Sequence, residues 1–108
     1  MKLRQYQIVI VNLDPTVGSE IKKTRPCVIV SPDEINENLK TVVITPITST
    51  KRNYPTRVKV SIKNKDSRIA IDQIRTIDRR RIIDVIGELK TKEIKEVKSI
   101  IKRTFVDN

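Results

Sequence analysis

The residues of this chain that could do chemistry gather in three polar stretches, each beside an apolar run. The first spans residues 13–26 and holds two acids, three cations and three hydroxyl groups. The others are 48–53 and 72–75, which follow runs of β-branched and aliphatic residues. Functional groups are commonly displayed on loops that an ordered scaffold positions, and a long loop between strands is often functional. The side-chain groups available for catalysis are therefore guanidinium, hydroxyl and carboxylate groups.

The composition excludes several kinds of site. The chain has no histidine, so imidazole ligands and histidine-containing triads are absent. A single cysteine, Cys27, excludes an intramolecular disulfide and a thiolate metal cluster, and we expect it to pack as a small apolar residue. Gly18 and Gly87 are the only glycines, too few for a glycine-rich phosphate loop. The carboxylates are scattered, so we expect no metal and no other cofactor.

This residue set suits phosphoryl chemistry on RNA, in which the substrate supplies its own nucleophile. The 2′-hydroxyl attacks the adjacent phosphorus and leaves a 2′,3′-cyclic phosphate and a 5′-hydroxyl. The protein must help to remove the 2′ proton, hold the attacking and leaving oxygens in line, and neutralise charge on the phosphoryl oxygens. Arginine suits the last task because its planar fork donates bidentately to phosphate and stays charged. We therefore assign Arg25 to charge stabilisation first, with general-acid work as a secondary option.

The charge balance points to a polyanionic partner. The 23 lysines and arginines exceed the 13 acids and give a formal net charge of +10, which is large for 108 residues. Nucleic acid is the first candidate, and a merely solvated basic surface is the alternative, especially for the lysines near the C-terminus. Only Tyr6, Tyr54 and Phe105 are aromatic, so base-stacking platforms cannot be numerous.

Length and hydropathy predict one cytoplasmic domain over residues 1–108. No apolar run approaches the roughly 18 residues that a membrane-spanning helix needs. The first residues lack the apolar region of a signal peptide. We therefore expect no membrane partner.

The polar stretches require strands to position them. The spacing of apolar residues predicts strands or strand-like runs at 7–13, 26–31, 41–47, 56–63, 69–71 and 82–89. Short helical segments are expected at 31–38, with Ser31 as the cap, and around 77–81. A final amphipathic helix begins at a capping Thr91 and carries apolar residues through Phe105. This pattern predicts a mainly β (α+β) fold, a small antiparallel barrel with a C-terminal amphipathic helix.

Three local features are expected to shape the strands. Pro46 suggests an edge, a bulge or the end of its strand. Residues 64–66 are expected to form a turn. In the strand at 56–63, Val58, Val60 and Ile62 alternate with basic and polar residues, so the face that includes Arg57 is expected to be solvent surface.

Four sequence blocks resemble a known toxin family. They are Leu13-Asp14-Pro15-Thr16-Val17-Gly18-Ser19-Glu20, Thr24-Arg25-Pro26, Pro46-Ile47-Thr48-Ser49 and Asp72-Gln73-Ile74-Arg75-Thr76-Ile77-Asp78. In order and spacing they are similar to the signature blocks of the MazF/PemK (Kid) toxins. The resemblance implies an SH3-like barrel, a homodimer, and a ribosome-independent endoribonuclease that cuts single-stranded mRNA at a short sequence. It also implies neutralisation by a cognate antitoxin, which we expect to lay an acidic segment across the basic groove.

The resemblance also implies roles for individual residues. Arg25 and Thr48 match the family's catalytic arginine and threonine, and Glu20 is a candidate general base or loop-orienting group. The alternatives are an ion-pairing arginine, a turn-capping hydroxyl, and a Glu20 carboxylate paired with nearby cations. The second-tier candidates for RNA binding are Ser19, Lys22, Lys23, Ser49, Thr50, Asp72, Gln73 and Arg75.

The chain departs from some relatives at two positions. Ser19 and Ala70 stand where certain plasmid-borne members carry histidine and arginine, so the acid–base roles of those members do not transfer intact. Asp72 matches an aspartate implicated in them, but an aspartate at a strand end also often caps a turn. Two other functions remain open at this point, a CcdB-like toxin that acts by protein binding and a non-catalytic RNA-binding barrel.

Overall fold

The computed structural model describes residues 1–13 and 24–107. Within them, the helices are α1 (Asp33–Asn38) and α2 (Thr91–Phe105), and single 3₁₀ turns form η1 (Ile71–Gln73) and η2 (Arg79–Arg81). The strands are β1 (Gln7–Asn12), β2 (Thr24–Ile29), β3 (Thr41–Thr48), β4 (Arg57–Ile62), β5 (Lys65–Ala70), β6 (Arg75–Asp78) and β7 (Ile82–Glu88). No described helix is long and apolar enough to cross a membrane.

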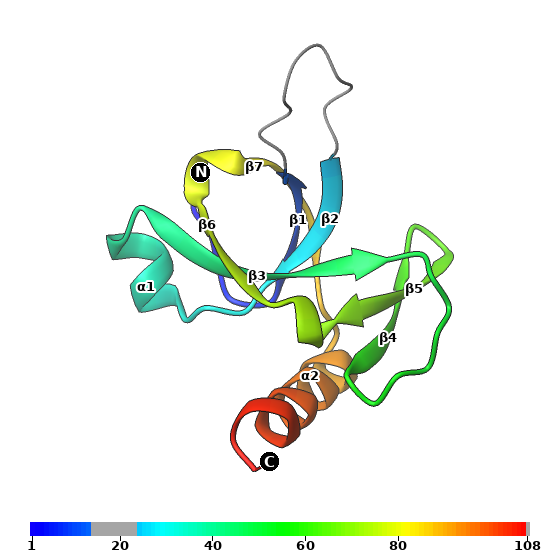
Figure 1. Ribbon diagram of the computed structural model, residues 1–108. Coiled ribbons are helices and arrows are strands. Elements are labelled where there is room, and N and C mark those ends of the chain that lie inside the picture. Colours follow the sequence, from blue (N-terminus) through cyan, green and yellow to red (C-terminus); the bar gives the residue numbers. More distant parts are fainter. Residues whose placement is uncertain (14–23, 108) are drawn as a thin grey trace.

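The strands form one strongly curved antiparallel sheet in the order β4-β5-β3-β2-β1-β7, and β6 also pairs with β3. Because β6 leads through η2 into β7, and β7 pairs with β1, the chain itself closes a ring of β1, β2, β3, β6 and β7 (Figure 1). The hairpin of β4 and β5 extends from this ring beside the end of β3. The predicted mainly β, antiparallel fold is confirmed. It is a half-barrel, because none of the described strand pairings joins β6 to β7 and the ring closes there only through the chain at η2.

Side-chain alternation along β1 and β2 separates two apolar cores, since successive residues of a strand face opposite sides of the sheet. Val9 and Cys27 lie in the core inside the ring, together with Ile44 of β3. Ile8 and Val28 face the other way and join the core beneath α2. Both cores are aliphatic, and Cys27 is fully buried as predicted. The shared strands are therefore held from both faces.

Helix α2 packs on the β4 side of the sheet and is amphipathic as predicted. Val97 and Ile100 are buried, whereas Lys92, Lys95 and Lys98 are exposed. The helix reaches Phe105 as predicted, but that residue is 52% exposed and does not join the buried stripe.

Strand β3 continues through Pro46, contrary to the expected interruption. Residues 41–44 pair with β6, and after Pro46 the same edge of β3 pairs with β5 at Ile47 and Thr48. Pro46 itself lies opposite Cys27 of β2. The proline, which has no N–H to donate, therefore stands where β3 exchanges one partner for another. This exchange carries Thr48 to the end of the strand beside the β4–β5 hairpin.

The β4–β5 hairpin turns at Lys63 and Asn64, both with positive φ angles of 49° and 64°. Two central residues with positive φ form the turn type that matches the twist of paired strands. The turn expected at 64–66 is therefore one residue too late, and Lys65 already belongs to β5, opposite Ile62. Arg57 is not solvent surface either. Its side chain is only 10% exposed and pairs with Asp72.

The predicted helix caps are also corrected. The cap position of α1 is Pro32, and the Ser31 hydroxyl instead donates to Asn36 Oδ1 and accepts from the Val43 N–H. The cap position of α2 is Lys90, whose N–H donates to Glu93 Oε1 at 2.8 Å. The helical turn expected at 77–81 is confined to η2, since residues 75–78 form β6.

Candidate active site

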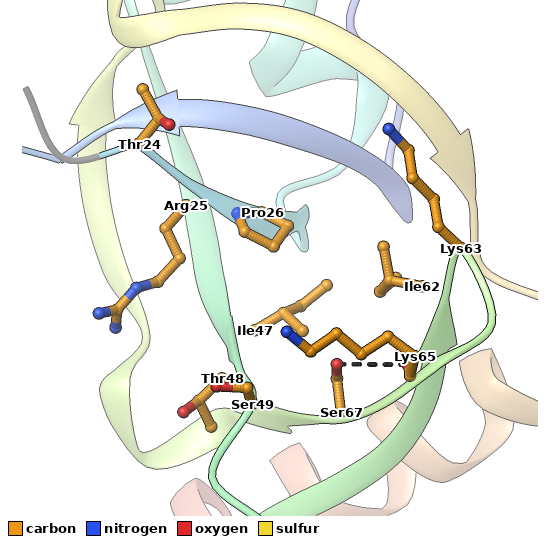
Figure 2. Close-up of a pocket in the computed structure, with 10 residues that line it drawn as sticks. All are labelled: Thr24, Arg25, Pro26, Ile47, Thr48, Ser49, Ile62, Lys63, Lys65 and Ser67. Carbon is orange, nitrogen blue, oxygen red and sulfur yellow. Dashed lines mark hydrogen bonds between the residues drawn. The ribbon is translucent and has the colours of Figure 1, made fainter.

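A pocket of about 430 Å³ lies where the start of β2, the end of β3 and the β4–β5 hairpin meet (Figure 2). Its lining brings Arg25 of β2 together with Thr48 and Ser49 at the end of β3. Pro26, Ile47 and Ile62 give the pocket an apolar floor. Two of the three polar stretches of the sequence therefore contribute to one site.

The pairing of β2 with β3 accounts for the meeting of Arg25 and Thr48. Cys27 lies opposite Pro46 in this antiparallel ladder. The ladder ends at this pair, so Arg25 and Thr48 each lie two residues beyond it, at neighbouring strand ends. Pro26 has no N–H to donate to the ladder. The strand ends can therefore present these two side chains to a ligand instead of to each other.

Arg25 is exposed at the start of β2, where its backbone pairs with Val11 of β1. None of the described carboxylates pairs with its guanidinium group, since the ion pairs among described residues join Arg57 to Asp72, Arg68 to Asp66, Arg80 to Asp78 and Lys102 to Asp107. An arginine held on a rigid strand end can donate bidentately to a phosphate. The alternative of a surface ion pair has no support from these residues.

Thr48 is half-buried, and its Oγ1 accepts a hydrogen bond from the Thr50 N–H at 3.2 Å. Because this bond uses the oxygen as an acceptor, the hydroxyl proton stays available for donation. Ser49 and Thr50, the next two residues, are exposed. The expected turn-capping role of Thr48 and a ligand-binding role are therefore compatible in this geometry.

The opposite side of the pocket is lined by Lys63, Lys65 and Ser67, which were not predicted from the sequence. The register of the hairpin, which the position of its turn determines, would have identified them. A two-residue turn after Ile62 places Lys65 and Ser67 on the same face of the sheet as Ile62. The lining thus holds three cations and no described carboxylate, a combination that favours an anionic ligand.

Cys27 reports on the electrostatics beneath the pocket. Burial raises the pKa of its thiol to about 12, although the guanidinium groups of Arg25 and Arg75 lower it in part. Arg75 therefore contributes positive potential to the same region as Arg25, though it is not part of the pocket lining. The neutral, buried thiol is unsuited to nucleophilic work.

The third polar stretch lies outside the pocket. Asp72 accepts hydrogen bonds from Thr56 Oγ1 at 2.8 Å and from Arg57 Nε at 2.9 Å. Partial burial alone would raise the pKa of Asp72, but these hydrogen bonds outweigh it, so the pKa lies below its usual value. Gln73 is exposed on η1. The structure thus ties Asp72 to β4 rather than presenting it beside Thr48.

Four predicted site residues, Ser19, Glu20, Lys22 and Lys23, lie outside the described residues. Among the residues that the structure does describe, no group of three or more cysteines and acids could hold a metal ion.

A half-barrel that displays arginine, lysine and hydroxyl groups around one pocket defines an antiparallel β protein with a cationic pocket at its strand ends. The chain belongs to the family of PemK-like, MazF-like toxins of type II toxin–antitoxin systems, which it matches over residues 4–105. The family resemblance of the four sequence blocks is therefore confirmed.

Known relatives agree with this assignment. A protein of Staphylococcus saprophyticus named endoribonuclease MazF is 34% identical over 105 residues, which cover 92% of this chain and 88% of the relative. Among solved structures, the Mycobacterium tuberculosis toxin MazF-mt6 is 27% identical with a TM-score of 0.79, covering 92% of this chain and 95% of that one. A MazE–MazF structure from Deinococcus radiodurans is 23% identical, and its TM-score of 0.83 over 95% of each chain supports the fold.

Proposed function

We propose that this protein is an endoribonuclease toxin that cuts single-stranded mRNA at a short sequence, without a metal ion, and is inhibited by a cognate antitoxin. The observation that carries the proposal is the meeting of Arg25 and Thr48 at one pocket whose described lining is cationic. The name of the Staphylococcus saprophyticus relative, endoribonuclease MazF, supports the same activity.

In the proposed reaction, the 2′-oxygen of the RNA attacks the adjacent phosphorus while the bond from phosphorus to the 5′-oxygen breaks. The 2′ proton passes to a base, and the departing 5′-oxygen gains a proton, which leaves a 2′,3′-cyclic phosphate and a 5′-hydroxyl. The guanidinium of Arg25 neutralises the charge that grows on the phosphoryl oxygens, and the Thr48 hydroxyl donates to one of them. Glu20 is the candidate base, and it lies outside the described residues.

The RNA-binding candidates extend from this centre. Ser49 and Thr50 continue the wall that carries Thr48, and Arg75 adds positive potential near Arg25. Ser19, Lys22, Lys23, Gln73 and Asp72 remain second-tier candidates on the strength of the family resemblance. For Asp72, the hydrogen bonds to Thr56 and Arg57 favour the structural role.

The cleavage proposal is tested by mapping the ends produced from a long defined RNA in the presence of EDTA. We expect cuts at one short sequence with cyclic-phosphate and 5′-hydroxyl ends. Arg25→Ala and Thr48→Ala should each lower kcat by about a hundredfold to a thousandfold, because each removes a donor from the developing charge. Arg103→Ala on α2, which removes an exposed cation far along the sequence, serves as the control and should cut normally.

Full activity in Arg25→Ala or Thr48→Ala would refute the site assignment. Absence of cleavage by the native protein, with toxicity to cells retained, would favour the CcdB-like alternative of a toxin that binds a protein. RNA binding without cleavage or toxicity would favour the non-catalytic barrel. Circular dichroism of each variant confirms that the fold is intact.

Two partners follow from the same proposal. An acidic antitoxin segment is complementary to the cationic pocket and would exclude RNA from it. Relatives solved as MazE–MazF and as an endoribonuclease with its cognate antitoxin support this. Titration of the neighbouring gene product into the cleavage assay should abolish cutting, and unchanged cutting would refute it. The family resemblance also implies a homodimer, which sedimentation equilibrium tests.

A further inference from the structure

The side chain of Lys65 occupies the pocket in a way that the proposed chemistry does not use. It enters from the β5 side, and its ammonium group points across the pocket toward the wall that carries Arg25 and Thr48 (Figure 2). Lys63, by contrast, points away from Thr48 along the rim. Lys65 is thus the hairpin cation that is directed into the site.

The hairpin fixes this direction. Lys65 lies opposite Ile62 immediately after the two-residue turn, so its position depends on only two intervening residues. Strand alternation places Lys65 and Ser67 on the pocket face and Asp66 and Arg68 on the other face. The Ser67 hydroxyl also donates to the Lys65 carbonyl oxygen at 3.4 Å, which ties the two pocket residues together.

The charge of Lys65 is not neutralised within the described structure. The nearest carboxylate in sequence, Asp66, pairs with Arg68 at 2.8 Å on the opposite face. None of the ion pairs among described residues includes Lys65. An unpaired ammonium that faces a second cation, Arg25, across an open pocket suits a ligand that carries more than one negative charge.

We infer that Lys65 binds a second phosphate of the RNA, next to the one held by Arg25 and Thr48. This inference rests on the proposed ribonuclease function. The sugar between the two phosphates would lie over the apolar floor of Pro26 and Ile47. Lys65 thereby fixes the path of the strand through the pocket and contributes to RNA binding rather than to the bond-breaking step.

Binding to an RNA that cannot be cut tests this assignment separately from catalysis. The probe is a fluorescent single-stranded RNA with a 2′-deoxy sugar at the cleavage position, or a mixed-sequence RNA if no cleavage is found. Lys65→Ala should raise Kd by about tenfold, the usual effect of losing one charge-assisted contact. The slope of log Kd against log salt should become shallower by about 0.7, because one phosphate contact is lost on a single strand. Lys65→Arg should restore both.

Lys59→Ala is the matched control. Lys59 is an exposed lysine of the same hairpin, and alternation along β4 places it on the face opposite the pocket. Its removal changes the net charge equally and should alter Kd and the salt slope much less. With cleavable RNA, Lys65→Ala should raise KM and leave kcat within about twofold, as expected for an interaction made equally in the ground state and the transition state.

Uncharged methylphosphonate linkages locate the contact. A single methylphosphonate is placed at one or the other of the two phosphates that flank the cleavage position. One of these two substitutions should weaken binding to the native protein about tenfold and leave binding to Lys65→Ala unchanged. Equal Kd and salt slope for Lys65→Ala and the native protein would overturn the inference, and so would an effect no larger than that of Lys59→Ala. Failure of the native protein to cut RNA would refute the ribonuclease proposal. The binding measurements would still decide whether Lys65 contacts an RNA phosphate.

Discussion

At the scale of single residues, the burial of a side chain decides its chemistry as much as its type does. Cys27 is the only thiol of the chain and sits one residue from the pocket-lining Pro26. Its complete burial in the ring core raises its pKa to about 12 despite two nearby guanidinium groups. A thiolate is the reactive form of cysteine, so this thiol is inert at physiological pH.

We therefore predict that Cys27 resists alkylation in the folded protein. At pH 8, iodoacetamide should label less than about a tenth of the protein in a time that fully labels a urea-unfolded sample. Mass spectrometry measures both. Complete labelling of the folded protein at the rate of a free thiol would contradict the predicted burial.

Asp72 shows how a residue can resemble a catalytic group and still be engaged elsewhere. Its sequence position matches an aspartate implicated in some relatives. Those relatives also carry an arginine at the position of Ala70, which this chain lacks. Here Arg57 and Thr56 hold its carboxylate against β4. That pairing joins residues 15 and 16 positions apart, so it depended on the fold and could not be inferred from the local sequence.

At the scale of the elements, the loop after β3 determines where Thr48 can point. Arg68 of β5, directly opposite Thr48, is only 5% exposed. Its Nε and Nη2 donate to Asn53 Oδ1 at 3.4 and 3.3 Å, and its Nη1 donates to Asp66 at 2.8 Å. The far end of the loop is fastened where the Ile71 N–H donates to the Thr56 carbonyl. The loop that carries Ser49 and Thr50 is thus held at both ends.

We predict that Asn53→Leu lowers kcat by about fivefold to tenfold and costs roughly 1 kcal/mol of unfolding free energy, because the two long hydrogen bonds from the buried Arg68 guanidinium to Asn53 are lost. Asn53→Asp keeps the acceptor oxygen and should restore kcat. Cleavage kinetics and urea unfolding measure the two effects. In an Arg68→Leu background, Asn53→Leu should have little further effect, and fully additive losses would show that the two residues do not act together.

Local patterns predicted the elements better than their ends and partners. Alternation between 56 and 63 gave a strand and its buried face, and helical spacing gave α2. The start of β2 at Thr24 depends on pairing with Asn12, which no local pattern records. The turn at Lys63 was missed because lysine is not a usual residue for positive φ. Lys65 was consequently missed as a pocket residue.

The site was predictable only in part for the same reason. Arg25, Thr48 and Ser49 were predicted as site residues from the sequence blocks, and the structure places all three at one pocket. Their proximity follows from the register of β2 against β3, a long-range pairing. The resemblance to relatives pointed to the residues, but it carried no information about which side chains of the hairpin complete the pocket.

At the scale of the whole molecule, part of the positive charge is structural. The segment Arg79–Arg81 resembles a basic patch for RNA, yet two of its side chains bind backbone carbonyls. Arg79 donates to the Asn36 carbonyl at 2.6 Å and to that of Met1 at 3.1 Å, and Arg81 donates to the Asn12 carbonyl at 3.3 Å. These contacts fasten η2 where the chain closes the ring. The net charge of +10 therefore overstates the surface available to a polyanion.

Asp78, at the start of η2, stabilises the folded state through a charge that acid removes. Hydrogen bonds from the Arg80 side chain and then from the Arg80 N–H lower the pKa of Asp78 from 3.8 to about 2. A carboxylate whose pKa is lower in the folded state stabilises that state above its unfolded pKa. The contribution disappears as the pH falls through the folded value. The relevant window therefore runs from about pH 4 down to about pH 2.

We predict that Asp78→Asn lowers Tm slightly at neutral pH, by a few degrees at most because the pair is exposed, and that this difference from the native protein disappears as the pH falls through that window. Asparagine keeps an oxygen that can accept from the Arg80 N–H, so the substitution isolates the charge. Thermal unfolding between pH 2 and pH 7 measures the effect. In an Arg80→Gln background the pH-dependent difference should shrink, because the cation that depresses the pKa is gone. A difference in Tm that stays constant across the whole range would show that the pKa of Asp78 is not depressed in the folded state.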